Sequence, residues 1–85
     1  MQTTIEFPCR YPIKIVGVQS DAFEQQVVDI VRIHAPEFTA ADVSLRLSNQ
    51  GRYSSVTIFI EAQGEPQLKA IFNDLKAHPQ VKMVL

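Results

Sequence analysis

The sequence has little cysteine, no long apolar run and almost no net charge, and each shortage excludes a class of protein. The single cysteine, Cys9, cannot form an internal disulfide, so we expect an ordinary thiol in a fold held by its hydrophobic core. No apolar stretch approaches the ~20 residues that a membrane helix needs. The first twelve residues contain Glu6 and two prolines instead of the apolar run of a signal peptide. We therefore expect a cytoplasmic protein without a membrane partner.

The charge balance narrows the choice of partner further. Nucleic acids and anionic membranes are bound by clustered Lys and Arg, whereas this chain has a formal net charge of -1. Hydrophobic residues form 46% and charged residues 20% of the chain, which is typical of a globular protein. With 85 residues, the chain is long enough for one domain with a modest core. We expect residues 1–85 to form that single domain.

Alternation of apolar and polar residues with a period of two predicts four strands. The predicted strands cover residues 11–18, 43–48, 53–62 and 81–85. Turn-forming residues at 49–51 join the second and third strands into an antiparallel hairpin. The strand side chains expected in the core are Ile13, Ile15, Val43, Leu45, Leu47, Val56, Ile58, Ile60 and Met83.

Proline and glycine mark the start and end of the first strand. Pro8 and Pro12 favour an irregular N-terminal arm over residues 1–10. Gly17, near the end of the strand, indicates a bulge or a close approach of another part of the chain.

Apolar residues at helical spacing predict two helices. Ser20 and Asp21 are suited to the N-cap and first turn of the first helix, which Pro36 ends. Its buried stripe is Phe23, Val27, Ile30, Val31 and His34. Pro66 is suited to the first turn of the second helix. Its buried stripe is Leu68, Ile71, Phe72 and Leu75. Thr39 and Asp42 are expected to cap a short helical turn between the first helix and the second strand.

The order strand, helix, strand, strand, helix, strand predicts an α+β fold of the ferredoxin-like βαββαβ type. In this fold a four-stranded antiparallel sheet carries both helices on one face, and the first and third strands are central. The open face would then bring together Val16, Val18, Phe59 and Val84, which we interpret as an interface with a second copy or a partner protein. Scattered surface apolar residues are the alternative interpretation.

The sequence offers little support for chemistry on this fold. Residues 51–56, GRYSSV, resemble an RNA-binding motif, but Ser55 and Lys14 occupy the positions where aromatic rings would stack on bases. The loop after the first strand has no cysteine pair for a metal and no arginine for a phosphate. No acid and base are paired, so we expect neither an enzyme nor a bound metal or cofactor, and no nucleic acid partner.

Several segments together resemble the YbeD-like family of small bacterial proteins. They are EFP, KIVG, VVDIVRIHAP, SNQGRYSSVTIFIEA and the terminal VKMVL, in order from Glu6 to Leu85. The resemblance implies a bacterial cytosolic protein with a fold similar to ACT regulatory domains, in a family that is functionally uncharacterised. Some members carry the label of lipoate regulatory protein. The resemblance implies no catalytic residues.

ACT domains often bind an amino acid near the loop after the first strand and at a dimer interface. This similarity implies a ligand site at Gly17, Val18, Gln19 and Ser20, before the first helix. We therefore expect a non-enzymatic regulatory or small-ligand-binding domain, acting as a dimer or on a partner. The alternative is a protein-protein interaction module that uses the open sheet face.

Overall fold

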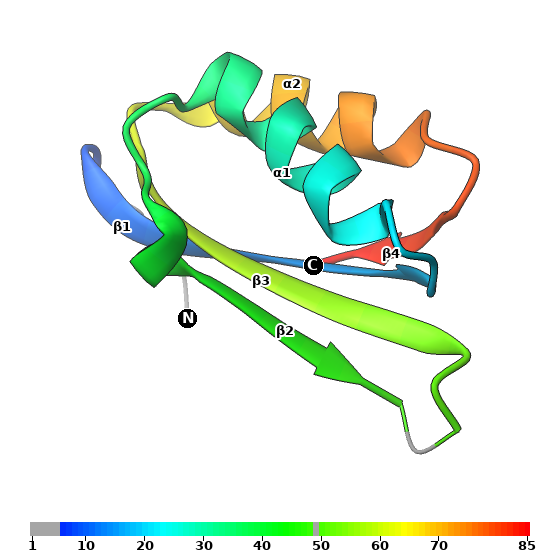
Figure 1. Cartoon of the computed structure of the whole chain (residues 1–85). Helices are drawn as coiled ribbons and strands as arrows, with labels where there is room; N and C mark the ends of the chain where they lie inside the picture. Colours follow the sequence, from blue (N-terminus) through cyan, green and yellow to red (C-terminus); the bar gives the residue numbers. More distant parts are fainter. Residues whose placement is uncertain (1–5, 49) are drawn as a thin grey trace, which may run out of the picture.

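The computed structural model describes residues 6–48 and 50–85, so position 49 of the predicted turn and the first half of the predicted arm lie outside it (Figure 1). Its elements are β1 (Cys9–Val18), α1 (Phe23–His34), the 3-10 turn η1 (Ala40–Asp42), β2 (Val43–Leu47), β3 (Tyr53–Ala62), α2 (Glu65–Lys76) and β4 (Val81–Val84). The four strands form one antiparallel sheet in the order β2-β3-β1-β4. Figure 1 shows both helices on one face of the sheet, which confirms the predicted ferredoxin-like plan.

The core lies between the helices and the inward side chains of β1 and β3. Ile13 and Ile15 of β1 and Val56 and Ile58 of β3 are fully buried, as their alternation predicts. From the helices, the buried side chains are Phe23, Val27, Val28, Val31, Leu68, Ile71 and Leu75. Each large apolar side chain removed from water contributes roughly 1.5–3 kcal/mol, so this layer supplies most of the stability.

The prediction that Leu45 and Leu47 are buried is wrong. Both face the helix side of the sheet, because Leu45 pairs with Val56 and Leu47 with Ser54, yet they are 45% and 52% exposed. The helices lie over β1, β3 and β4, and the twist of the sheet carries β2 away from them. Sequence alternation gave the correct face of β2 but not its coverage.

The predicted faces of β4 are also wrong, and a bulge is the cause. Val84 lies opposite Ile15 and packs on the core, whereas Met83 lies opposite Val16 on the open face. The register shifts between Val16 and Gly17, where Gly17 pairs with Val81. One extra residue in a strand moves the following side chains to the other face. Val84 is therefore not on the open face, and Met83 is not in the core.

Two predicted boundaries differ from the structure. β1 begins at Cys9 instead of after residue 10, because Cys9 and Arg10 continue the ladder opposite Ala62 and Glu61. α1 begins at Phe23 with Ala22 at its N-cap, so the Ser20 side chain does not cap it. The Phe23 amide instead donates to the Ser20 carbonyl at 3.2 Å, which closes a turn before the helix.

The predicted cap of the short turn is confirmed. At η1 the Thr39 hydroxyl accepts from the Ala41 amide at 3.3 Å, and the Asp42 carboxylate accepts from the Thr39 amide at 3.0 Å. This reciprocal capping box holds the chain where it enters β2.

Candidate functional site

The loop predicted to bind a ligand, Gly17 to Ser20, is closely packed. A Cβ on Gly17 would lie 2.5 Å from the ring of Phe23 and 2.4 Å from the carbonyl oxygen of Gln80. The glycine is therefore explained by the packing of Phe23, which is fully buried. This observation confirms the predicted close approach at Gly17.

The backbone amides of Val18 and Gln19 and the side chain of Gln19 already have partners in the protein. The Val18 backbone amide donates to the Gln80 carbonyl oxygen at 2.9 Å, and the Gln19 backbone amide donates to the Arg52 carbonyl oxygen at 2.8 Å. The Gln19 side chain accepts from the Ser54 hydroxyl. The Ser20 hydroxyl is buried and has no hydrogen-bond partner in the described part of the chain. A backbone cradle for an anion is thus occupied by internal hydrogen bonds, and a binding role for Gly17, Val18, Gln19 and Ser20 stays a prediction.

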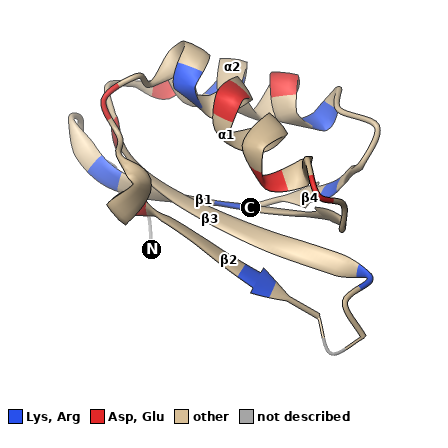
Figure 2. Ribbon diagram, viewed as in Figure 1, with Lys and Arg blue, Asp and Glu red and all other residues tan. Residues whose placement is uncertain are grey.

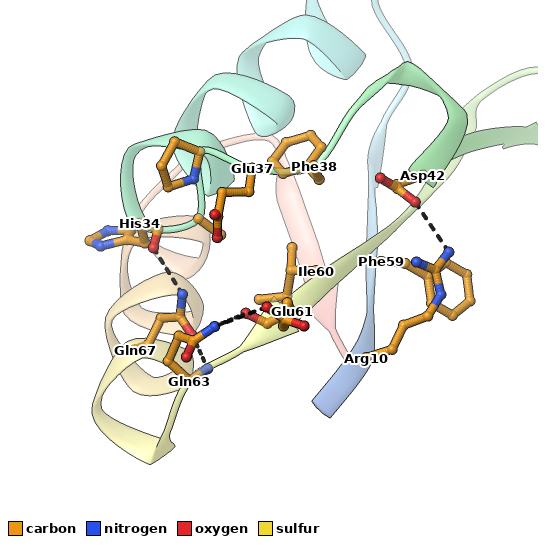
Figure 3. A pocket seen from close by; sticks show the side chains of 12 residues that line it. Arg10, His34, Glu37, Phe38, Asp42, Phe59, Ile60, Glu61, Gln63 and Gln67 are labelled. Carbon is orange, nitrogen blue, oxygen red and sulfur yellow. Dashed lines mark hydrogen bonds and ion pairs between the residues drawn. The ribbon is translucent and has the colours of Figure 1, made fainter. Parts of the chain in front are cut away.

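A hollow of about 480 Å³ lies at the other end of the molecule (Figure 3). It is bounded by the loop between α1 and η1, the end of β3 and the first turns of α2. Ile60 and Phe38 contribute apolar surface, and Glu37 and Glu61 contribute carboxylates. No pattern in the sequence predicts this hollow, because its walls come from segments far apart in the chain.

One side of the hollow is an ion pair stacked on an aromatic ring. The Arg10 guanidinium lies 3.1 Å from the Asp42 carboxylate and 4.6 Å from the centre of the Phe59 ring. A hydrogen bond from the Thr39 amide lowers the pKa of Asp42 below its usual value, and Arg10 lowers it further. Partial removal of water from the carboxylate raises the pKa, but by less than these interactions lower it. Asp42 is therefore charged at neutral pH, and Arg10 is held over Phe59.

The opposite side of the hollow joins α1 to α2. The Gln67 side-chain amide donates to the His34 carbonyl at 2.9 Å and accepts from the Gln63 backbone amide at 2.7 Å. The His34 ring lies 2.6 Å from the carboxylate of Asp74 on α2. Because Gln67 is satisfied at both ends, it acts as a structural tie between the helices.

The polar side chains that line the hollow are those of Arg10, His34, Glu37, Asp42, Glu61, Gln63 and Gln67. Across residues 6–48 and 50–85, no group of three His, Cys, Asp or Glu side chains is arranged to hold a metal ion. Its one arginine is paired with Asp42, and its exposed carboxylates, Glu37 and Glu61, are acceptors without a nucleophile beside them.

The open face of the sheet is the second candidate site. Side chains of residues paired directly across strands share a face, so the register places Val18 beside Tyr53, and Val16 beside Met83. Leu85 exchanges two backbone hydrogen bonds with Lys14 and lies on the same face. We call Val16, Val18, Tyr53, Met83 and Leu85 the open-face patch. Tyr53, Met83 and Leu85 are 47%, 51% and 60% exposed.

Phe59 lies apart from this patch. It pairs with Pro12, two rows of outward side chains away from Val16, and Arg10 covers its ring. Of the four predicted interface residues, Val16 and Val18 lie together on the open face. Phe59 lies on the same face but apart from them, and Val84 lies on the helix side of the sheet. Met83 and Leu85 were missed because the bulge in β4 leaves no mark in the sequence of that strand. The role of Val16, Val18 and Phe59 in an interface stays a prediction.

Among the described residues, no helix combines the length and the apolar character needed to cross a bilayer.

Solved structures share this fold. Protein HP0495 from H. pylori matches with a TM-score of 0.75 at 16% identity, over 99% of this chain and 88% of that chain. The ACT domain from GTP pyrophosphokinase of Chlorobium tepidum matches with a TM-score of 0.66 at 16% identity, over 87% of this chain and 80% of that domain. These likenesses confirm the predicted ACT-like fold.

Curated bacterial proteins are similar along nearly the whole sequence. A UPF0250 protein of Pseudomonas paraeruginosa is 49% identical, over 95% of this chain and 88% of its own length. One from Hahella chejuensis is 48% identical, over 95% and 89%, and one from Chromobacterium violaceum is 44% identical, over 99% and 94%. The family model described as "Protein of unknown function (DUF493)" matches residues 2–85. The predicted YbeD-like resemblance is thus confirmed, and the chain belongs to the uncharacterised DUF493 family with its UPF0250 relatives.

Proposed function

We propose that this protein is a non-enzymatic regulatory domain that binds a partner protein with the open face of its sheet. The open-face patch carries this proposal. Figure 1 shows helices on one face of the sheet only, and the uncovered face presents half-exposed tyrosine, methionine and leucine side chains together. Large apolar side chains gathered on one face of a small domain are typical of a protein-binding surface.

The comparisons support action on a separate chain. The GTP pyrophosphokinase neighbour is an ACT domain taken from a larger enzyme. The curated relatives, by contrast, consist of little more than this domain, since the chain covers 88% to 94% of their length. A regulatory domain that is not fused to its target has to reach it by non-covalent association, which requires a docking surface.

A double variant tests the proposal. Tyr53→Ser with Met83→Ser removes apolar contact area from the open-face patch, while Ile33→Ser removes it from α1, where Ile33 is 75% exposed. Cross-linking in living bacteria followed by quantitative mass spectrometry measures the bound proteins. We expect the double variant to lose a specific partner that wild type and Ile33→Ser retain, with unchanged melting of all three. If the double variant and Ile33→Ser recovered the same amount of that partner, a role for the open face would be contradicted.

The hollow favours a second candidate function, the binding of a small molecule. Its volume of about 480 Å³ falls in the range of small-molecule sites, which is roughly 300–1,000 Å³. Amide NMR titration with pooled amino acids and lipoyl compounds tests it. Shifts clustered between Ile60 and Gln67 would support the hollow, and shifts between Gly17 and Phe23 would support the predicted loop instead. A spectrum that does not respond would leave neither site standing for these compounds.

A further inference from the structure

We infer that the open sheet face recognises an acidic segment of another protein, one that carries apolar side chains between its carboxylates. The inference rests on the proposed function and names the chemistry of the partner. It is drawn from the distribution of charge between the two layers of the fold, which the net charge of -1 conceals.

The two layers have opposite charge (Figure 2). The four strands hold Arg10, Lys14, Arg46 and Lys82 against a single acid, Glu61. The helical side, residues 19–42 and 63–80, holds seven acids and three bases. Figure 2 accordingly shows blue segments on the strands and red segments mainly on the helices and their loops. The sheet is therefore the basic side of an almost neutral protein.

Two cations on the open face of the sheet are available to a partner. Arg10 is paired with Asp42 and lies opposite Glu61, so its charge is compensated at that end of the sheet. Lys14 and Arg46 form no ion pair within residues 6–48 and 50–85. The uncompensated charge of Lys14 lies directly beside the open-face patch, because the patch extends from the row of Lys14 to the hairpin end of the sheet.

The register fixes where these cations lie relative to the open-face patch. Lys14 is opposite Leu85, and Ser55 pairs with both Val16 and Arg46, which places Arg46 in the row of Val16. The two cations are one outward row and two strands apart, or about 12 Å between Cα atoms from standard sheet spacings. Carboxylates three or four residues apart in an extended segment have about the same spacing, and the segment between them crosses Ser55 and Thr57 of β3. Apolar residues that follow the carboxylate at Lys14 then extend over β1 and β4, where Val16 and Met83 lie.

The same charges argue against other occupants. Two copies stacked by their open faces would bring Lys14 and Arg46 against a surface of like charge, which is unfavourable. A nucleic acid would find the ring of Phe59 already covered by Arg10, and the central positions of the face occupied by Thr57 and Ser55. An acidic, apolar protein segment satisfies both the free cations and the open-face patch.

Matched charge reversals test the inference. Lys14→Glu with Arg46→Glu alters the open face, and Lys69→Glu with Lys76→Glu makes the same change in net charge on α2. The probes are a synthetic peptide that repeats Asp-Ser-Leu-Ser, which puts Asp and Leu on the same face of an extended strand, a peptide of the same length with Lys in place of Asp, and oligo(dT). Binding is followed by amide NMR shifts at two salt concentrations, with thermal melting as the check on folding.

We expect the acidic peptide to shift the amides of Lys14, Val16 and Ser55, and to bind more weakly as salt rises. Its affinity should fall about tenfold or more in the open-face variant and stay within about twofold in the α2 variant. Preference for the basic peptide or for oligo(dT), equal weakening in both variants, or no binding would each overturn the inference. If the Tyr53 and Met83 variant loses its cellular partner while the charge variant keeps it, the proposed function stands and the acidic partner does not.

Discussion

Replacement of Gly17 by alanine should cost more stability than any other single methyl group added to a glycine of this domain. The new Cβ would lie 2.4 Å from the Gln80 carbonyl oxygen and 2.5 Å from the ring of Phe23. Both neighbours are constrained: Phe23 is fully buried, and the Gln80 carbonyl accepts the hydrogen bond of the Val18 amide. Neither can move aside without disturbing the junction of β1 with α1 and β4.

Two opposing effects set the size of the loss. Gly17 lies outside the left-handed backbone region, so alanine gains about 0.4–1 kcal/mol from the reduced entropy of the unfolded chain. Overpacking of a tight site costs about 1–3 kcal/mol or more, and here one of the clashing atoms belongs to the backbone. Because the backbone clash places the cost in the upper part of this range, the expected net destabilisation is about 1–2.5 kcal/mol. For a domain of this size it corresponds to a fall in Tm of roughly 5–20 °C.

Urea unfolding followed by circular dichroism measures the loss, and Gly64→Ala is the matched control. A Cβ on Gly64 meets only the Pro66 side chain, at an ordinary 3.6 Å, and its φ of 169° is extended backbone. We expect the control to be as stable as wild type or slightly more so. If Gly17→Ala proved no less stable than Gly64→Ala, the close approach of Phe23 and Gln80 would not exist in solution.

Two further predictions concern the hairpin and the cap of η1. Gly51 has a φ of 69° with nothing within 4 Å of a Cβ, so Gly51→Ala should cost about 1–2 kcal/mol from backbone strain alone, and Gly51→Asn should cost less in the same urea assay. The pKa of Asp42 is lower in the folded state, so its contribution to stability is present above the unfolded pKa of about 3.9 and is lost as pH falls through the folded value. Urea midpoints should thus differ between wild type and Asp42→Asn at pH 7, and the difference should shrink as pH falls below about 4 and through the folded pKa of Asp42. A difference that did not shrink on acidification would show that the shape of Asp42, and not its charge, stabilises the fold.

The sequence predicts the elements of this fold because its local signals agree. The alternation from Val56 to Ala62 and the glycine at 51 specify a hairpin that needs no information from distant residues. Pro36 ends α1 where predicted, and Thr39 with Asp42 caps η1. Such features depend on neighbours in the chain.

The errors arise where distant segments meet. The faces of Met83 and Val84 depend on a bulge that forms only when β4 pairs with β1 around Gly17. The alternation within β2 predicts that Leu45 is a core residue. Leu45 is exposed because the helices lie over the other three strands. The hollow and the open-face patch have the same origin, so the candidate sites were less predictable than the fold.

The position of β1 at the centre of the sheet has a consequence for the synthesis of the protein on the ribosome. β1 pairs only with β3 and β4, and the segment 19–52 has to be synthesised before its first partner, Tyr53, appears. At about 5–20 residues per second, this delay lasts roughly 2–7 s. Throughout it, the apolar run from Ile13 to Val18 has both of its edges unpaired, although a finished domain of this type folds far faster. Protection of the nascent chain during those seconds, and not the stability of the folded domain, should therefore govern how much of the protein escapes aggregation.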